Sequence, residues 1–114
     1  MHKEIEIGTI LQLKQHCLHN EKGKIGVCFD MYYLDGKEHP GFSVILENGE
    51  YSGFSDDEIE TYFTKLYNTS FKYNFSNVMN LCKDFDNGLF KKVFEKGKLL
   101  QKSNRSFNIY SSFY

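Results

Sequence analysis

The chain has 114 residues, a formal net charge of −1 and an aromatic content of 17%. This aromatic content excludes an intrinsically disordered chain, because disordered segments contain few aromatic residues. No apolar run approaches the roughly 20 residues of a membrane-spanning helix, and the first residues contain no apolar signal core. Three scattered cysteines form neither a disulfide framework nor a zinc-binding pattern. We therefore expect a soluble, cytoplasmic protein without a membrane partner, folded as a single domain over residues 1–114.

The first half of the chain has the pattern of β-strands. Residues 9–14 form a short predicted strand, and residues 24–33 alternate in the way typical of a half-buried strand. Apolar runs at 42–47 and 50–51 flank Asn48-Gly49, which predicts a hairpin with a type I′ turn because both turn residues tolerate positive φ. The alternation places five side chains on one face of the second strand: Ile25, Val27, Phe29, Met31 and Tyr33. Cys28 falls on the opposite face, where we expect it to behave as a small buried hydrophobe.

A helix is predicted at about residues 55–66. Ser55 and Glu58 have the spacing of a capping box, and Asp56 and Asp57 suit the positive end of the helix dipole. Apolar residues then recur at helical spacing: Ile59, Tyr62, Phe63 and Leu66.

The second half, residues 67–114, is predicted as a mixed addition. Residues 71–75 alternate like a strand, and Ser76 or Asn77 can cap a further helix. The apolar face of that helix would contain Val78, Leu81, Cys82 and Phe85. Residues 89–97 suggest another helical segment that stops at Gly97, and alternation over 107–113 suggests a final strand.

Charge is distributed unevenly along the chain. Residues 1–63 carry five lysines and twelve acids, a net charge of −7, whereas residues 64–114 carry eight lysines, one arginine and three acids, a net charge of +6. Three interpretations stay open. The two halves attract each other within the fold, the basic half meets phosphate, or the acidic half meets a basic partner.

The segments Gly8-Thr9-Ile10-Leu11-Gln12-Leu13-Lys14 and Lys22-Gly23-Lys24-Ile25-Gly26-Val27 are similar to the opening of small SH3-like barrels. The resemblance covers residues 8–63. It implies an α+β fold, namely a small SH3-like antiparallel β-barrel with added C-terminal helices and a possible final strand. The chain also resembles small accessory proteins of bacteria, their phages and mobile elements, anti-CRISPR proteins among them, because it is rich in Lys, Asn, Ile, Phe and Tyr.

We expect a non-catalytic protein-binding module rather than an enzyme. Its candidate surface combines aromatic anchors with an acidic rim, as protein interfaces do: Glu50, Tyr51, Phe54, Asp56, Asp57, Glu58 and Glu60. Such a surface would suit a protein that normally binds nucleic acid, for example a host defence protein that it would occlude. An alternative role for Phe54 is to plug the end of the barrel.

A nucleic-acid-binding module is the alternative function. Its candidate residues lie in the basic C-terminal segment: Lys91, Lys92, Lys96, Lys98, Lys102 and Arg105. Phe90, Phe94 and Phe107 are interleaved with them and could stack on bases. Phe90 and Phe94 also have helical spacing with Val93, which favours a core position for them.

A small metal-dependent hydrolase is the second alternative function. For the favoured protein-binding module, by contrast, we expect no metal and no cofactor. His16, Cys17 and His19 form one possible ligand set, without the second pair that a zinc site requires. The acids of residues 56–60 are explained by helix capping. No phosphate-binding glycine loop or nucleophile elbow is present.

Overall fold

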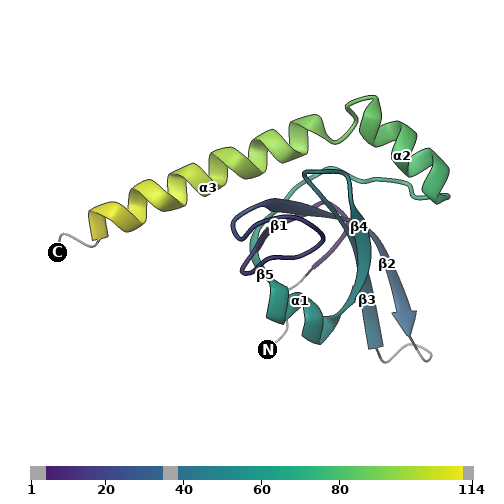
Figure 1. The fold of residues 1–114 in the computed structure, drawn as a ribbon, viewed down its shortest axis with the longest axis horizontal. Coiled ribbons are helices and arrows are strands. Elements are labelled where there is room, and N and C mark those ends of the chain that lie inside the picture. The colour runs from purple at the N-terminus through teal and green to yellow at the C-terminus, as the bar shows by residue number, and fades with distance from the viewer. Residues whose placement is uncertain (1–4, 35–38, 112–114) are drawn as a thin grey trace.

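The structure is a computed structural model that describes residues 5–34 and 39–111, with side chains described over 5–33 and 39–101. Over these residues the fold is an α+β arrangement of one antiparallel sheet and three helices (Figure 1). The elements are β1 (Thr9–Leu13), β2 (Ile25–Leu34), β3 (His39–Leu46), β4 (Tyr51–Ser55), α1 (Asp56–Tyr62), β5 (Phe63–Asn68), α2 (Val78–Asp86) and α3 (Lys91–Ser111). The five strands have the order β4-β3-β2-β1-β5, and the sheet does not close into a barrel.

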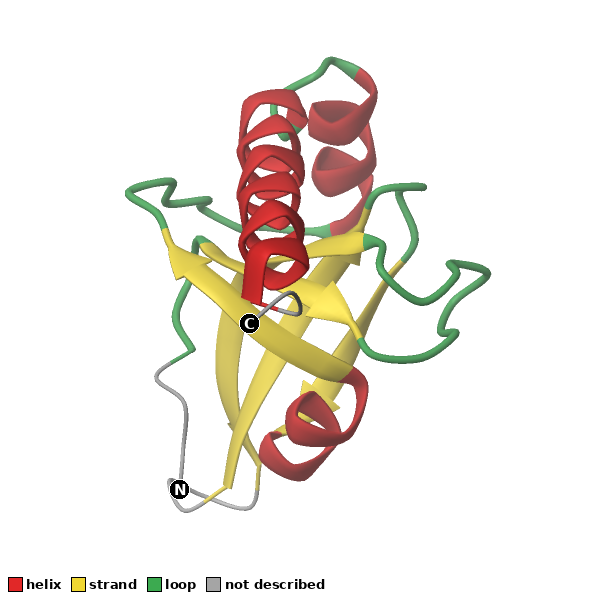
Figure 2. Ribbon diagram, turned by 90° about the vertical axis from the view of Figure 1, so that its left-hand side faces the viewer, coloured by secondary structure: helices red, strands yellow, loops and turns green. Residues whose placement is uncertain are grey.

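Both faces of the sheet are covered by apolar side chains, because successive residues of a strand point to opposite faces. One face packs against α1, and the core cluster between them contains Leu11, Cys28, Val44, Phe54, Ile59 and Phe63. The other face packs against α2, α3 and the segment before them, and the core cluster between them contains Ile10, Val27, Ile45, Tyr73, Phe90 and Val93. Figure 2 shows α2 and α3 together above the sheet and α1 at the other end.

A β-bulge changes the phase of β2. Val27 pairs with Ile45 and Cys28 with Val44, but the next partner of β3, Ser43, pairs with Asp30 rather than Phe29. The extra residue moves Met31 to the face of its partner Phe42, since paired residues share a face. The prediction that Met31 and Tyr33 continue the face of Ile25, Val27 and Phe29 is therefore wrong, and both side chains are exposed.

The β3–β4 hairpin is confirmed, but its turn differs from the prediction. Glu47, Asn48 and Gly49 form a three-residue loop that is closed by a bond from the Leu46 N–H to the Glu50 carbonyl. Gly49 has a φ of 90°, whereas Asn48 is not among the residues at positive φ, so the turn is not type I′.

The predicted helix over 55–66 ends four residues early. Its capping box is present, with both Ser55 and Glu58 bonded as expected. At Phe63 the backbone becomes extended, and the chain continues as β5, pairing with β1 through Phe63 and Leu13. Pairing along the β1 edge buries Phe63, and this burial outweighs the helical spacing of Phe63 and Leu66.

Two further strand predictions are wrong. Residues 71–75 form no strand, and their aromatic rings pack against α2 and α3 instead of alternating in a sheet. Residues 107–111 belong to α3, while 112–114 lie outside the described residues. The helix also does not stop at Gly97.

Candidate functional site

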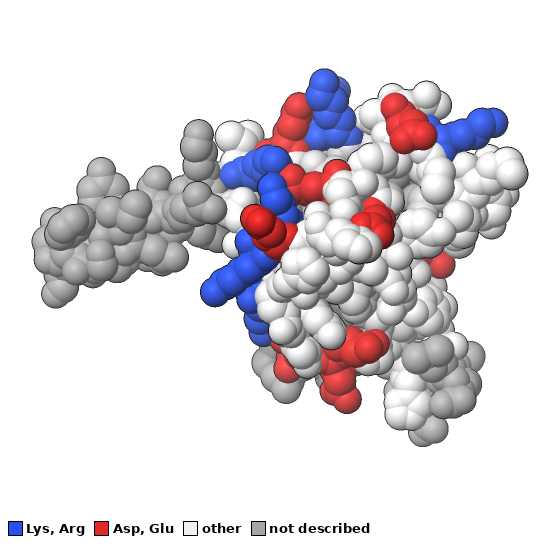
Figure 3. Space-filling view, viewed as in Figure 1, with Lys and Arg blue, Asp and Glu red and all other residues white. Residues whose placement is uncertain are grey.

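The acidic side chains of α1 lie at one end of the molecule. Asp57, Glu58 and Glu60 are exposed, and Asp56 is half-buried. The Glu58 carboxylate accepts a hydrogen bond from the Ser55 N–H, so it caps the helix while it remains exposed to solvent. In Figure 3 acidic side chains gather at the lower edge, where α1 lies, and basic side chains gather mainly toward α3.

The two predicted aromatic anchors are separated by the sheet. Phe54 is buried and packs edge-on against Phe63, with the ring centroids 5.2 Å apart. It therefore fills the core beneath α1. The sequence suggested a buried role for Phe54 at the end of a barrel, but the sheet that it covers does not close into one. Tyr51 is 37% exposed and contacts Phe29 on the other face. The acidic side chains of α1 are therefore exposed without the aromatic anchor that the sequence analysis expected Phe54 to provide.

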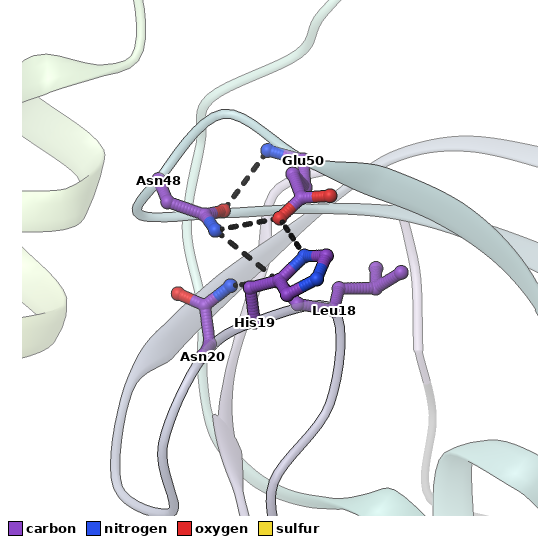
Figure 4. Close-up of polar contacts among 5 residues, drawn as sticks. All are labelled: Leu18, His19, Asn20, Asn48 and Glu50. Atoms are coloured by element: carbon purple, nitrogen blue, oxygen red, sulfur yellow. Dashed lines mark hydrogen bonds and ion pairs between the residues drawn. The ribbon is translucent and has the colours of Figure 1, made fainter.

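Glu50 lies at the opposite end of β4 from α1, where the hairpin meets the loop that follows β1. Its Oε2 is 2.8 Å from Nδ1 of His19 and accepts a 2.9 Å hydrogen bond from Nδ2 of Asn48. The Asn48 amide also donates to the carbonyl of Leu18 (Figure 4). The sequence did not predict this network.

The loop tip in this network has an unusual backbone. Leu18 and His19 have φ values of 49° and 61°, and Cys17 and Asn20 on either side exchange two backbone hydrogen bonds. A left-handed conformation costs a non-glycine residue roughly 1–2 kcal/mol. The Asn20 and Asn48 amides both donate to the Leu18 carbonyl and stabilise this turn. Nothing in the local sequence identifies it, because turns of this kind favour Asn and Gly.

Tyr32 lies across two glycines of the neighbouring strands. A Cβ at Gly41 would overlap its ring, and a Cβ at Gly53 would overlap its hydroxyl. The ring therefore crosses β3 and brings its hydroxyl to the outer strand β4. Burial, followed by the negative charges of Glu58 and Asp30, raises the pKa of Tyr32 above its ordinary value.

The basic candidates of the alternative site are divided between several contacts. Lys91 and Lys92 are exposed, whereas Lys96 lies over the Tyr67 ring at 4.7 Å and Lys98 bonds Glu47 at 2.7 Å. The side chains of Lys102, Arg105 and Phe107 are outside the described residues. Phe90 and Phe94 are 1% and 8% exposed, so neither ring is accessible for stacking on a base.

An apolar hollow of about 380 Å³ lies between α2, α3 and the hairpin. Phe85, Phe90 and Phe94 line it, and Glu47, Lys91, Glu95 and Lys98 lie around its rim. The acidic and basic groups of the rim balance, so the hollow carries no net preference for a charged ligand. Its aromatic lining results from packing between α2 and α3. The sequence pattern alone does not indicate that these two helices lie beside the hairpin.

The cysteines and histidines are not brought together. Cys28 is buried, and burial raises its pKa to about 12. Cys82 is exposed, which contradicts its predicted position on an apolar helix face. Among the described residues, no three Cys, His, Asp or Glu side chains are grouped closely enough to hold a metal ion.

Comparison with protein-family models, curated proteins and solved structures returned no match. Within the described ranges, none of the helices combines the length and apolar character needed to cross a membrane.

Proposed function

We propose that this protein is a non-catalytic protein-binding module that meets a basic partner surface through the acidic end formed by α1. One observation carries this proposal: exposed carboxylates of α1 face solvent at the end of the sheet away from α3 (Figure 3). The side chains of Asp57 and Glu60 form no ion pair or hydrogen bond with any residue that the structure describes.

Attraction between the two halves of the chain accounts for only part of the charge asymmetry. Lys72 of the basic half lies 3.5 Å from Glu6, and Lys98 lies 2.7 Å from Glu47. Both acceptors belong to the acidic half, and both lie outside α1. The exposed carboxylates of α1 thus remain available to a partner.

The partner we propose is a protein with a surface that normally binds nucleic acid, since α1 presents the same sign of charge as phosphate. In its most specific form, the protein is a phage or mobile-element inhibitor that occludes such a surface on a host defence protein. We also propose an SH3-like architecture. It is supported by the antiparallel strand order and by the short helix that joins β4 to β5.

The test is affinity capture from nuclease-treated bacterial lysate with the wild type and two variants. Asp57→Lys with Glu60→Lys reverses two exposed charges of α1. Asp86→Lys with Glu95→Lys makes the same change in net charge at exposed positions of α2 and α3. We expect a near-stoichiometric protein with the wild type and the control, and its loss with the α1 variant. Equal recovery by all three proteins contradicts the proposal.

Binding of nucleic acid would give a different result. It would disappear on nuclease treatment, and its affinity would fall steeply with salt because lysine contacts release counterions. Lys91→Gln with Lys92→Gln would reduce the slope of log affinity against log salt concentration by about 2, or about 1 for each lysine removed. Such a result would replace the protein-binding proposal by the nucleic-acid alternative.

A further inference from the structure

The outer strand β4 leaves backbone groups without partners. The Leu46 N–H bonds the Glu50 carbonyl, so Leu46 and Glu50 form a hydrogen-bonded pair. Such pairs alternate along an antiparallel ladder with pairs whose N–H and C=O groups point away from the partner strand. The register pairs Tyr51 with Ile45 and Gly53 with Ser43, which places both residues of β4 at outward-pointing positions.

These outward groups are accessible. Tyr51 and Gly53 are exposed, and their N–H groups donate to no residue that the structure describes. The next outward N–H along β4, that of Ser55, is already bonded to Glu58 at 2.9 Å. The free edge therefore consists of the N–H groups of two alternate residues, about 7 Å apart at the usual rise of a strand, together with the Tyr51 carbonyl. The Gly53 carbonyl also points outward and accepts a 3.5 Å hydrogen bond from the Ser52 hydroxyl, which a paired strand would replace.

The surroundings of this edge favour an occupant of positive charge. Glu50 precedes β4, and Asp56 and Asp57 follow it in the first turn of α1. Charged side chains on an edge strand commonly prevent it from pairing with another chain. β4 contains no charged side chain, so it lacks this protection against pairing. Tyr32 adds a hydroxyl beside Gly53, and this hydroxyl has no hydrogen-bond partner among the described residues.

A second copy paired through the same edge is disfavoured by charge. An antiparallel pair of β4 strands centred on Gly53 would place Glu50 of one copy opposite Asp56 of the other. Like charges that face each other across strands are destabilising. The same carboxylates attract a segment that carries Lys or Arg.

We propose that an extended basic segment of another protein adds to the sheet as a strand beside β4. Its backbone pairs with Tyr51 and Gly53, and its cationic side chains lie near the carboxylates at the two ends of β4. Strand addition derives affinity from main-chain hydrogen bonds and specificity from the side chains around the edge. This inference rests on the proposed protein-binding function and names the form of the partner.

The experiment uses a capped eight-residue peptide of alternating Lys and Val, with a Glu and Val peptide as its charge control. Binding to the full chain is followed by NMR, together with hydrogen exchange of the Tyr51 and Gly53 amides. We expect saturable binding of the basic peptide, at least about tenfold weaker binding of the acidic one, and slower exchange of both amides on pairing.

Tyr51→Pro and Tyr51→Ala separate backbone pairing from side-chain contact. Proline removes the outward N–H while leaving the ladder with β3 intact, as at tolerated edge positions. We expect Tyr51→Pro to weaken the basic peptide by about tenfold or more, in line with a lost hydrogen bond, and Tyr51→Ala to weaken it much less. Protection of the Ser52 and Phe54 amides in both variants shows that the sheet is intact.

Several outcomes overturn the inference. Binding of the basic peptide without protection of the Tyr51 and Gly53 amides, or with equal affinity for both Tyr51 variants, contradicts strand addition but leaves the acidic surface in place. Protection of these amides in the free protein, with a dimer in sedimentation, assigns the edge to a second copy. Absence of binding of the basic peptide at millimolar concentration also overturns the inference. None of these results tests the proposed function, which is decided by the capture experiment with the α1 variants.

Discussion

Gly97 of α3 and Ile25 of β2 are in close contact: a Cβ at position 97 would lie 2.8 Å from Cγ2 of Ile25. It would also lie 2.9 Å from Cγ2 of Ile10 on β1. The glycine therefore allows a long helix to cross two strands of the sheet at short distance. This role differs from the helix stop that the sequence pattern suggests.

We expect Gly97→Ala to destabilise the protein even though it improves helix propensity. Propensity favours alanine by about 1 kcal/mol, while overpacking a core contact costs typically about 1–3 kcal/mol. Gly97→Leu should cost more than Gly97→Ala. The measurement is urea unfolding, with the exposed Lys92→Ala as the control for helix propensity. A rise in stability for Gly97→Ala contradicts the close contact.

The Tyr32 hydroxyl and the Gly53 Cα should show strong coupling in a double-mutant cycle. Gly53→Ala overlaps the hydroxyl but not the rest of the ring, so we expect a loss of about 1–3 kcal/mol that Tyr32→Phe largely restores. Gly41→Ala overlaps the ring carbons, so Tyr32→Phe should not rescue it. Additive effects of Gly53→Ala and Tyr32→Phe in thermal unfolding would show that the hydroxyl lies elsewhere.

Glu47 connects α3 to the start of β2. Its carboxylate is 16% exposed, accepts a 2.7 Å hydrogen bond from the Ile25 N–H and pairs with Lys98. We expect Glu47→Ala to cost about 1–3 kcal/mol, since it leaves a buried N–H without a partner. Lys98→Ala should cost about 1 kcal/mol or less, because an exposed ion pair is screened by solvent. Equal losses in urea unfolding would contradict this division of roles.

The three thiols should react in a fixed order. Cys82 is exposed, Cys17 is half-buried with a pKa raised by burial and by the charge of Glu58, and Cys28 is buried with a pKa of about 12. Thiolate is the reactive form. We therefore expect a colorimetric thiol reagent at pH 8 to modify Cys82 first and Cys17 more slowly, and Cys28 only when the protein unfolds. Mass spectrometry of quenched samples identifies the sites, and early modification of Cys28 would contradict its burial.

Tyr73 should contribute stability that disappears at high pH. Burial, followed by the hydrogen bond to Asp84, raises its pKa from 10.0 to about 12. Because the raised pKa favours the protonated folded state, the contribution is complete below pH 10 and is lost as the pH rises toward 12. Tyr73→Phe should cost about 1 kcal/mol at pH 8 for its hydrogen bond and distinctly less at pH 11. A difference between the proteins that stays constant from pH 8 to 11 would contradict the shift.

The confirmed predictions depend on interactions between residues close in sequence. The capping box of Ser55 and Glu58 needs only three residues of spacing, and the β3–β4 hairpin needs a turn between two apolar runs. The alternation of Ile25, Val27 and Phe29 likewise predicted their shared face. The acidic surface of α1 follows from the same local pattern, since carboxylates in the first helical turn remain exposed while Ile59 faces the core.

The tertiary structure alone decided the features that depend on distant residues. Phe63 adopts an extended conformation because it pairs with Leu13 of β1, and Phe54 is buried beneath α1 instead of lying in the proposed interface. Gly97 does not end the helix but allows α3 to pack closely against Ile25 and Ile10. The free edge at Tyr51 and Gly53 also requires the hydrogen-bond register of β3 and β4. Sequence by itself thus determined local elements and the charge of each end, through propensity and capping. Tertiary packing decided which side chains and backbone groups reach the surface, because burial in a shared core outweighs local preference.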